Sequence, residues 1–153
     1  MTVRDAIKMS AEEVEAFLGE QKTLIVATIG RNGLPHLAPM WFAWVDGELV
    51  FCTDRKSQKI VNLQRDPRCS VLAEAGETYD QLRGVHMEGV TEFMPDLGRV
   101  VDAVVARNFG EVGSDPDARE ALRKAMSRRV AVIFRPTKTA SWDHRKTMSG
   151  VTP

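Results

Sequence analysis

The sequence predicts a mainly β fold, an antiparallel β-barrel of six strands decorated by helices, in a single domain. Short segments rich in β-branched and aromatic residues follow one another, and the turn signals Asn32-Gly33 and Asp46-Gly47 separate the first of them. Residues 36–45 are apolar at both alternating sets of positions, so a strand there needs cover on both faces, as in a small barrel pressed against a partner. The 153 residues fit one domain.

The strands follow from alternating apolar patterns, and most of them are joined by hairpins. The first helix begins at Ser10, which forms a capping box with Glu13, and Gly19 is expected to end it. The strands are expected at residues 22–29, 36–45, 49–53, 69–74, 82–93 and 129–135. Consecutive strands of this kind are typical of an antiparallel barrel.

Three more helices are expected between or after the strands. A short one is entered at Arg55 to Lys59, has Ile60, Val61 and Leu63 at roughly helical spacing and ends at Asp66-Pro67. A second has an apolar stripe of Leu97, Val100, Val101, Val104 and Val105. A third begins at Asp115-Pro116, and its predicted inward residues are Ala121, Leu122, Ala125 and Met126. The domain is expected to span 1–153, with a core of about 10–138 and a C-terminal tail of 139–153.

The composition excludes several classes of protein. Lys plus Arg and Asp plus Glu number 21 each, so no overall field would attract nucleic acid or an anionic membrane. No apolar run approaches the roughly 20 residues that span a bilayer. We find no signal-peptide pattern, and Cys52 and Cys69 are expected to be buried thiols in a reducing cytoplasm.

Common catalytic motifs do not occur in the sequence. It contains no Walker loop, no G-x-G-x-x-G and no G-x-S-x-G. The histidines, His36, His86 and His144, are too scattered to indicate a zinc site, so no metal is expected. No side chain is identified as catalytic.

The start of the helix near residue 57 is unusual because it is basic. Arg55, Lys56 and Lys59 lie where free N–H groups already place a partial positive charge, which disfavours further cations. An anion held by those N–H groups, the Ser57 hydroxyl and the basic side chains would reverse this effect. The pattern therefore predicts a phosphate site, although solvated surface lysines at Lys56 and Lys59 explain it equally well.

Met40, Trp41 and Trp44 form an aromatic and thioether cluster on the second strand. Such a cluster suits a flat conjugated ring. Packing in a barrel core or a dimer interface is the commoner explanation for such residues.

Four segments carry a family resemblance, namely 28–36, 39–42, 49–53 and, most specifically, Ser57 to Arg68. With these segments the chain resembles the pyridoxamine 5′-phosphate oxidase-like split barrels, and within them the actinobacterial flavin/deazaflavin oxidoreductases of the B group. The resemblance runs from about Ser10 to Lys138. It implies a split-barrel homodimer with two cofactor sites at the subunit interface.

The resemblance also implies which residues bind the cofactor. Its phosphate would contact Thr53, Arg55, Ser57 and Lys59, and Arg55 or Lys56 would replace an arginine that several relatives carry at the Ser57 position. Its ring would lie along the backbone of the second strand at His36, Ala38, Pro39, Met40 and Trp41. The segment from Trp142 to Lys146 would reach the neighbouring subunit's site.

The expected function is hydride transfer from reduced deazaflavin F420 to a conjugated small-molecule acceptor. Two alternatives remain open at this stage, an FMN-dependent oxidase or reductase and a non-catalytic cofactor-binding dimer. A coenzyme that supplies the hydride would explain why no catalytic constellation stands out in the sequence.

Overall fold

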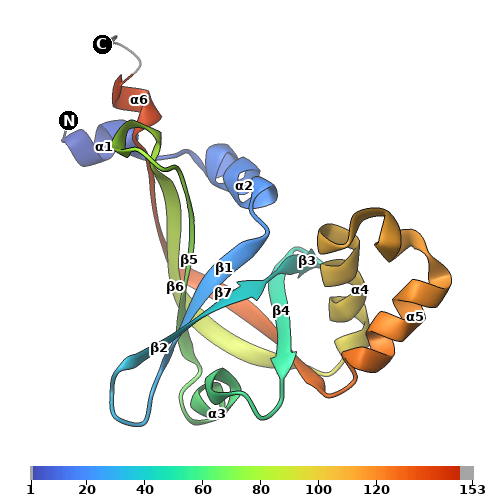
Figure 1. Cartoon of the computed structure of the whole chain (residues 1–153). Coiled ribbons are helices and arrows are strands. Elements are labelled where there is room, and N and C mark those ends of the chain that lie inside the picture. Colours follow the sequence, from blue (N-terminus) through green and yellow to red (C-terminus); the bar gives the residue numbers. More distant parts are fainter. Residues whose placement is uncertain (1, 149–153) are drawn as a thin grey trace.

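A computed structural model describes residues 2–148 and shows one antiparallel sheet of seven strands (Figure 1). The strand order is β2-β1-β5-β6-β7-β4-β3. The strands are β1 (Thr23–Ile29), β2 (Pro35–Trp41), β3 (Ala43–Val45), β4 (Glu48–Asp54), β5 (Arg68–Ala75), β6 (Arg83–Met94) and β7 (Arg129–Asp143). The predicted mainly β, antiparallel fold is confirmed, but the prediction of six strands was wrong.

The extra strand arises because the predicted strand 36–45 is interrupted at Phe42. Its first part, β2, pairs with β1, so that Met40 faces Leu24, and its second part, β3, pairs with β4. The Phe42 side chain is fully buried at the break. Because β2 and β3 lie at opposite ends of the strand order yet are one residue apart, the sheet must curl until its two ends approach each other. The result is a half-barrel.

The last strand is longer than the sequence predicted. It was expected to end at residue 135, but β7 continues to Asp143 and pairs with both β6 and β4. Trp142 therefore lies within the strand, opposite Gly84, whose missing side chain makes room for the indole ring. A Cβ at position 84 would lie 2.1 Å from that ring.

Two helices begin where the sequence predicted, and the short α1 and α6 were not predicted. Ser10 caps α2 and Asp115 caps α5, each by accepting backbone N–H groups, whereas Ser57 is the N-cap of α3 without a side-chain bond. The helices are α1 (Val3–Ile7), α2 (Ala11–Glu20), α3 (Gln58–Arg65), α4 (Leu97–Asn108), α5 (Pro116–Ala125) and α6 (Arg145–Met148), with short 3₁₀ turns at Tyr79–Gln81 and Gly110–Ser114.

Two predictions for these helices were wrong. Gly19 does not end α2, because a glycine costs a helix only about 1 kcal/mol and this one lies next to the helix end at Glu20. Ala121 and Ala125 are exposed on α5, and only Leu122 and Met126 of the predicted inward set are covered. Helix α5 packs mainly against α4 and the turn before it, so it has little sheet surface to cover.

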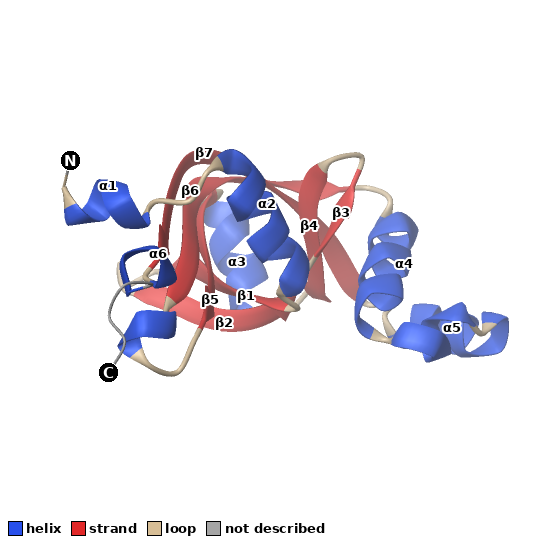
Figure 2. Cartoon of the chain, turned by 90° about the horizontal axis from the view of Figure 1, so that it is seen from above, coloured by secondary structure: helices blue, strands red, loops and turns tan. Residues whose placement is uncertain are grey.

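The core consists of two clusters on opposite faces of β4. The side chains of Leu49 and Phe51 point into the barrel interior, where α2 and α3 also contribute. Val50 and Cys52 point the other way, under the valine stripe of α4. Figures 1 and 2 show the consequence, with α2 and α3 at the barrel and α4 and α5 projecting from one side.

Arg107 of α4 connects the two parts. Its guanidinium donates to the carbonyl oxygens of Leu18 and Gly19, at 2.9 and 3.0 Å, near the end of α2. It also stacks on the rings of Phe42 and Trp44. Among residues 2–148 no helix is long and apolar enough to cross a membrane.

Candidate functional site

The turn before α3 presents an unpartnered hydroxyl group. Asp54 builds this turn, because its carboxylate accepts the Lys56 N–H at 2.8 Å and its carbonyl accepts the Ser57 N–H at 3.0 Å. The Ser57 Oγ atom is buried and has no hydrogen-bond partner in the chain. Buried hydroxyl groups are normally bonded, so this atom and the free amides of the first helical turn suit a bound anion.

Lys59 lies one turn further along α3 and directs its amine back to the end of β4. The Nζ atom donates to the Thr53 Oγ1 atom at 3.2 Å, and the Thr53 side chain is buried. Partial burial lowers the pKa of Lys59, and the nearby Arg129 lowers it further, whereas Asp54 opposes both effects. Lys59 is therefore a partly dehydrated cation beside a second cation.

Arg129 is the functional candidate that the sequence reasoning missed. It begins β7 opposite Asp54, and its guanidinium donates to the Cys52 carbonyl oxygen at 3.2 Å. Lys59 and Arg129 thus bind consecutive residues of β4. The available signal was a basic residue at the start of the strand that pairs with β4, but alternation alone does not reveal that pairing.

A hollow of about 400 Å³ lies between Thr53 and Arg129 on one side and the aromatic end of β2 on the other. That volume lies in the range of about 300 to 1,000 Å³ typical of small-molecule sites. Its lining comes from Thr23, Pro39, Met40, Trp41, Cys52, Thr53, Val104, Met126 and Arg129. The structure therefore brings the predicted ring-binding Pro39, Met40 and Trp41 together with the predicted phosphate-binding Thr53. The Trp41 ring, 42% exposed, stands edge-on to Phe109 with centroids 5.2 Å apart.

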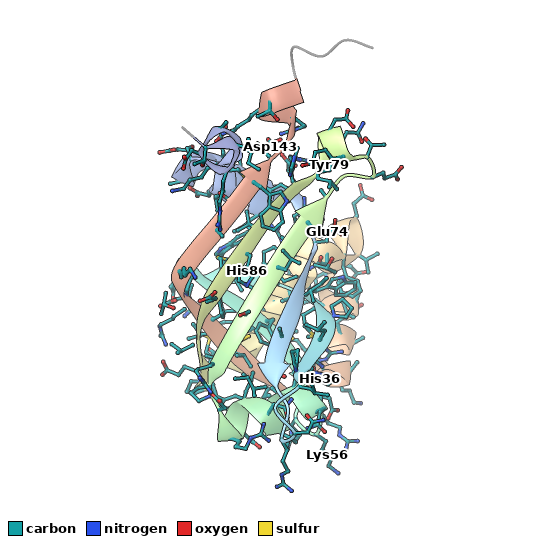
Figure 3. All side chains as sticks on the ribbon, turned by 90° about the vertical axis from the view of Figure 1, so that its left-hand side faces the viewer. His36, Lys56, Glu74, Tyr79, His86 and Asp143 are labelled. Atoms are coloured by element: carbon teal, nitrogen blue, oxygen red, sulfur yellow. The ribbon has the colours of Figure 1, made fainter. Side chains whose placement is uncertain are left out.

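None of the three predicted basic residues, Arg55, Lys56 and Lys59, lines this hollow, and Ser57 does not line it either. Arg55 turns toward the segment that joins α5 to β7, where its Nε atom donates to the Arg128 carbonyl oxygen at 3.2 Å. Lys56 is exposed, and Figure 3 shows it at the lower end of the molecule, pointing away from the sheet. Their role in binding an anion stays a prediction.

His36 lies at the other end of β2 from Trp41 and lines a different hollow, of about 510 Å³, with Gln58 and Asn62. Its Nδ1 atom is buried without a partner. Asn62 is fully buried and bonds both Thr28 and Gln58, which fixes α3 to β1. Ala38 is half-buried between His36 and Met40 on the same side of β2.

The two cysteines are free and buried, as predicted. Burial raises the pKa of the Cys69 thiol to about 12 and raises that of Cys52 against the opposing effect of Arg129. Within residues 2–148, no group of three or more His, Cys, Asp or Glu side chains is placed to hold a metal ion.

Comparison with protein families decides the classification. The model of the pyridoxamine 5′-phosphate oxidase family matches residues 10–143, which is most of the chain. The chain belongs to the pyridoxamine 5′-phosphate oxidase family. The expected resemblance is thereby confirmed at the level of the family.

Several solved structures share the fold of this chain. The conserved hypothetical protein Rv2991 from Mycobacterium tuberculosis is 42% identical, with a TM-score of 0.88 over 100% of this chain and 95% of that one. A protein named F420 reductase is 25% identical, with a TM-score of 0.63 over 82% of this chain and 94% of that one.

HutZ, the heme storage protein from Vibrio cholerae, is 16% identical, with a TM-score of 0.68 over 88% of this chain and 97% of that one, and this likeness shows the fold alone. The search of curated proteins gave no match.

Proposed function

We propose that this protein is a dimeric, F420-dependent oxidoreductase that passes a hydride from the reduced deazaflavin to a conjugated small-molecule acceptor. The observation that carries the proposal is the hollow in which a charged, anion-suited corner adjoins an aromatic wall. The 25% identity to a protein named F420 reductase supports the choice of coenzyme.

The residues of the corner fit a phosphate group. A phosphate oxygen would give the buried Ser57 hydroxyl the partner that the chain does not provide. The same group would neutralise the two cations, Lys59 and Arg129, that approach consecutive residues of β4. FMN and F420 both carry a phosphate at the end of a ribityl chain, so the corner suits either.

The chain's own contribution would be to bind, orient and exclude water. When bound, the coenzyme supplies the hydride chemistry. Pro39, Met40 and Trp41 would provide an apolar surface against which the ring rests, and Val104 and Met126 would shield it from solvent. Backbone groups of β2 would supply hydrogen bonds at the ring edge, because these side chains offer few donors.

A homodimer would complete the site. The outer face of β2 exposes Leu37, 63% accessible, together with Pro39 and Trp41, and in β1 the neighbouring Ile25 is also exposed. The pairing of β1 with β2 places these apolar side chains on one side of the sheet. A second copy seated there would cover the apolar surface and reach the hollow that Pro39 and Trp41 line.

Titration of the purified protein with F420 and with FMN tests the proposal. We expect binding of F420 and, with its reduced form, oxidation by a member of a panel of quinones, enones and tetrapyrroles. No binding of F420 below high micromolar concentrations would refute it.

Substitution of Lys59 tests where the phosphate binds. Lys59→Ala should cost about 1.5 to 3 kcal/mol of coenzyme binding, the range for a charge-assisted hydrogen bond, or roughly 10- to 150-fold in affinity. The control is Lys56→Ala, which removes the same charge from an exposed position and should change affinity far less. Equal losses in the two variants would remove Lys59 from the site.

Two alternatives have support of their own. A FAD-binding protein from Mesorhizobium loti shares the fold at 18% identity, and a flavin enzyme would be purified yellow from expression. The heme storage protein HutZ also has this fold. The second alternative is therefore a non-catalytic, cofactor-binding dimer. Such a protein would bind its cofactor without turnover of any acceptor in the panel.

A further inference from the structure

Arg55 holds the segment between α5 and β7 in place. Its backbone N–H donates to the Arg128 carbonyl oxygen at 3.3 Å, and its Nε atom donates to the same oxygen at 3.2 Å. Its Nη2 atom reaches the Ser127 carbonyl oxygen at 3.5 Å. These contacts join residues 72 and 73 positions apart, and two of them fix one carbonyl group.

The segment that Arg55 holds leads directly into Arg129. The Arg129 N–H donates to the Met126 carbonyl oxygen at 2.9 Å and closes a tight turn. The Arg128 carbonyl oxygen belongs to the peptide group that ends at the Arg129 nitrogen. Because a peptide unit is planar, fixing that peptide group fixes the N–Cα bond of Arg129. The pairing of Arg129 with Asp54 then sets the torsion about this bond and hence the direction of the side chain.

Arg129 and Lys59 reach the same corner from opposite sides. Arg129 donates to the Cys52 carbonyl oxygen and Lys59 to the Thr53 hydroxyl oxygen, so their charges lie about one residue apart along β4. Among the charged groups here, Asp54 is the opposing carboxylate, and one of its oxygens is occupied by the Lys56 N–H. Two cations near one carboxylate leave a surplus of positive charge at the end of β4, where the turn to α3 begins.

We infer that Arg129 is, with Lys59, the second phosphate-binding cation of the site and that Arg55 is its positioning residue, so that the pair selects coenzymes whose ribityl chain carries a phosphate group. The inference rests on the proposed function and deepens it. It assigns Arg55 a different task from direct contact with the phosphate. Arg55 directs its Nε and Nη2 atoms to the carbonyl oxygens of the 127–128 segment instead.

The experiment compares a coenzyme with its phosphate-free counterpart. The pairs are FMN with riboflavin, which differ by the phosphate alone, and F420 with the ribityl deazaflavin that lacks both the phosphate and the tail attached to it. The pair used is the one whose ring the wild-type protein binds. Arg129→Gln should weaken binding of the phosphorylated form about tenfold or more and leave the phosphate-free form within about twofold. Arg128→Gln is the matched control, because it removes the same charge from the adjacent, exposed position and should change neither affinity.

A double-substitution cycle tests the positioning role of Arg55. Arg55→Gln alone should weaken the phosphorylated form several-fold and spare the phosphate-free form. In the Arg55→Gln, Arg129→Gln double variant the loss should equal that of Arg129→Gln alone, because Arg55 acts through Arg129. Losses that add would overturn the positioning role, and equal losses for both ligand forms would overturn the phosphate selectivity.

Two further measurements keep the outcomes distinct. Far-ultraviolet circular dichroism and thermal unfolding check that each variant is folded, and if Arg129→Gln is not, Arg129→Lys should retain part of the phosphate preference. A wild-type protein that binds no member of either pair refutes the proposed function and the inference together. If the wild-type protein binds the phosphorylated coenzyme and Arg129→Gln binds it with the same affinity, the inference alone is refuted.

Discussion

The barrel and the α4–α5 hairpin are built from the same chain but are stabilised very differently. In the barrel, Phe17, Phe51 and Phe134 are almost fully buried, and β1 pairs with β5 and β4 with β7, strands that are distant in sequence. In the hairpin, α4 buries its valine stripe against β3 and β4, whereas α5 buries none of its ten residues. The stability of the barrel is therefore global, while the hairpin is attached to it mainly through the valine stripe of α4, and α5 is weakly packed.

The candidate site lies on the boundary between these two regions. Trp41 and Thr53 come from the barrel, and Val104 and Met126 come from the hairpin and the turn after it. The side of the hollow formed by Trp41 and Thr53 is therefore rigid, whereas the side formed by Val104 and Met126 is more easily displaced. This arrangement would let a large coenzyme enter without opening the barrel.

The largest expected effect is the loss of a barrel side chain. Phe51 is fully buried in the interior cluster, so Phe51→Ala should lower the free energy of unfolding by about 3 to 5 kcal/mol. Leu122→Ala in α5 is the control, and because that side chain is only half-buried its loss should be clearly smaller. Urea denaturation followed by fluorescence measures both, and similar losses would contradict the contrast between the regions.

The two cysteines provide an intermediate test. Cys52 and Cys69 are 3% and 5% exposed, but Cys52 lies under α4 and Cys69 lies inside the barrel. Local opening of the hairpin should therefore expose Cys52 alone. In the single-cysteine variants Cys69→Ala and Cys52→Ala, we expect Cys52 to react with iodoacetamide at pH 8 at least about tenfold faster than Cys69. A tenfold ratio corresponds to a difference of about 1.4 kcal/mol in the free energy of local opening.

The high pKa of both buried thiols keeps each of them protonated until it is exposed, so the labelling rate reports opening. Mass spectrometry over a time course at low urea concentration measures the two rates. Equal rates would mean that the hairpin opens only when the whole domain unfolds.

The smallest expected effect comes from two helix caps. Ser10 accepts the Glu13 N–H at 3.2 Å in α2, and Asp115 accepts the Asp117 N–H at 2.9 Å in α5. Ser10→Ala should lower the global free energy of unfolding by about 0.5 to 2 kcal/mol. Asp115→Ala should instead reduce amide-exchange protection within α5 and leave that of the barrel strands unchanged. Loss of protection in β5 and β6 after Asp115→Ala would show that the hairpin and barrel unfold as one unit.

Local chemistry made much of the fold predictable. The turn at Asp46-Gly47 has positive φ angles at both residues, 53° and 79°, as the dipeptide suggested, and Ser10 and Asp115 cap the helices they were expected to cap. These features depend on residues adjacent in sequence. The break at Phe42 could not be predicted in this way, because the apolar pattern is continuous there and only the choice of partner strand divides it.

The length of β7 was hidden for a similar reason. Pro136 and the polar residues after it resemble a loop, since proline cannot donate to a strand pair. In the structure Pro136 sits at the register shift between Glu88 and Gly89, where the ladder is already irregular. For the site, basic residues near α3 were visible, but which of them face the hollow depends on side-chain direction. Arg129 appears only once β4 and β7 are paired.

The position of β7 has a consequence for how the chain is made. This strand lies between β6 and β4 in the sheet, yet it is the last of the seven strands to emerge during synthesis. Until it arrives, the β3–β4 hairpin and the β2-β1-β5-β6 group cannot be joined by backbone pairing. In the nascent chain, the backbone groups of β4 and β6 that β7 will pair with therefore stay unpaired. Such late, long-range closure slows folding and exposes unpaired edges, so chaperone demand should rise when translation pauses before residue 129.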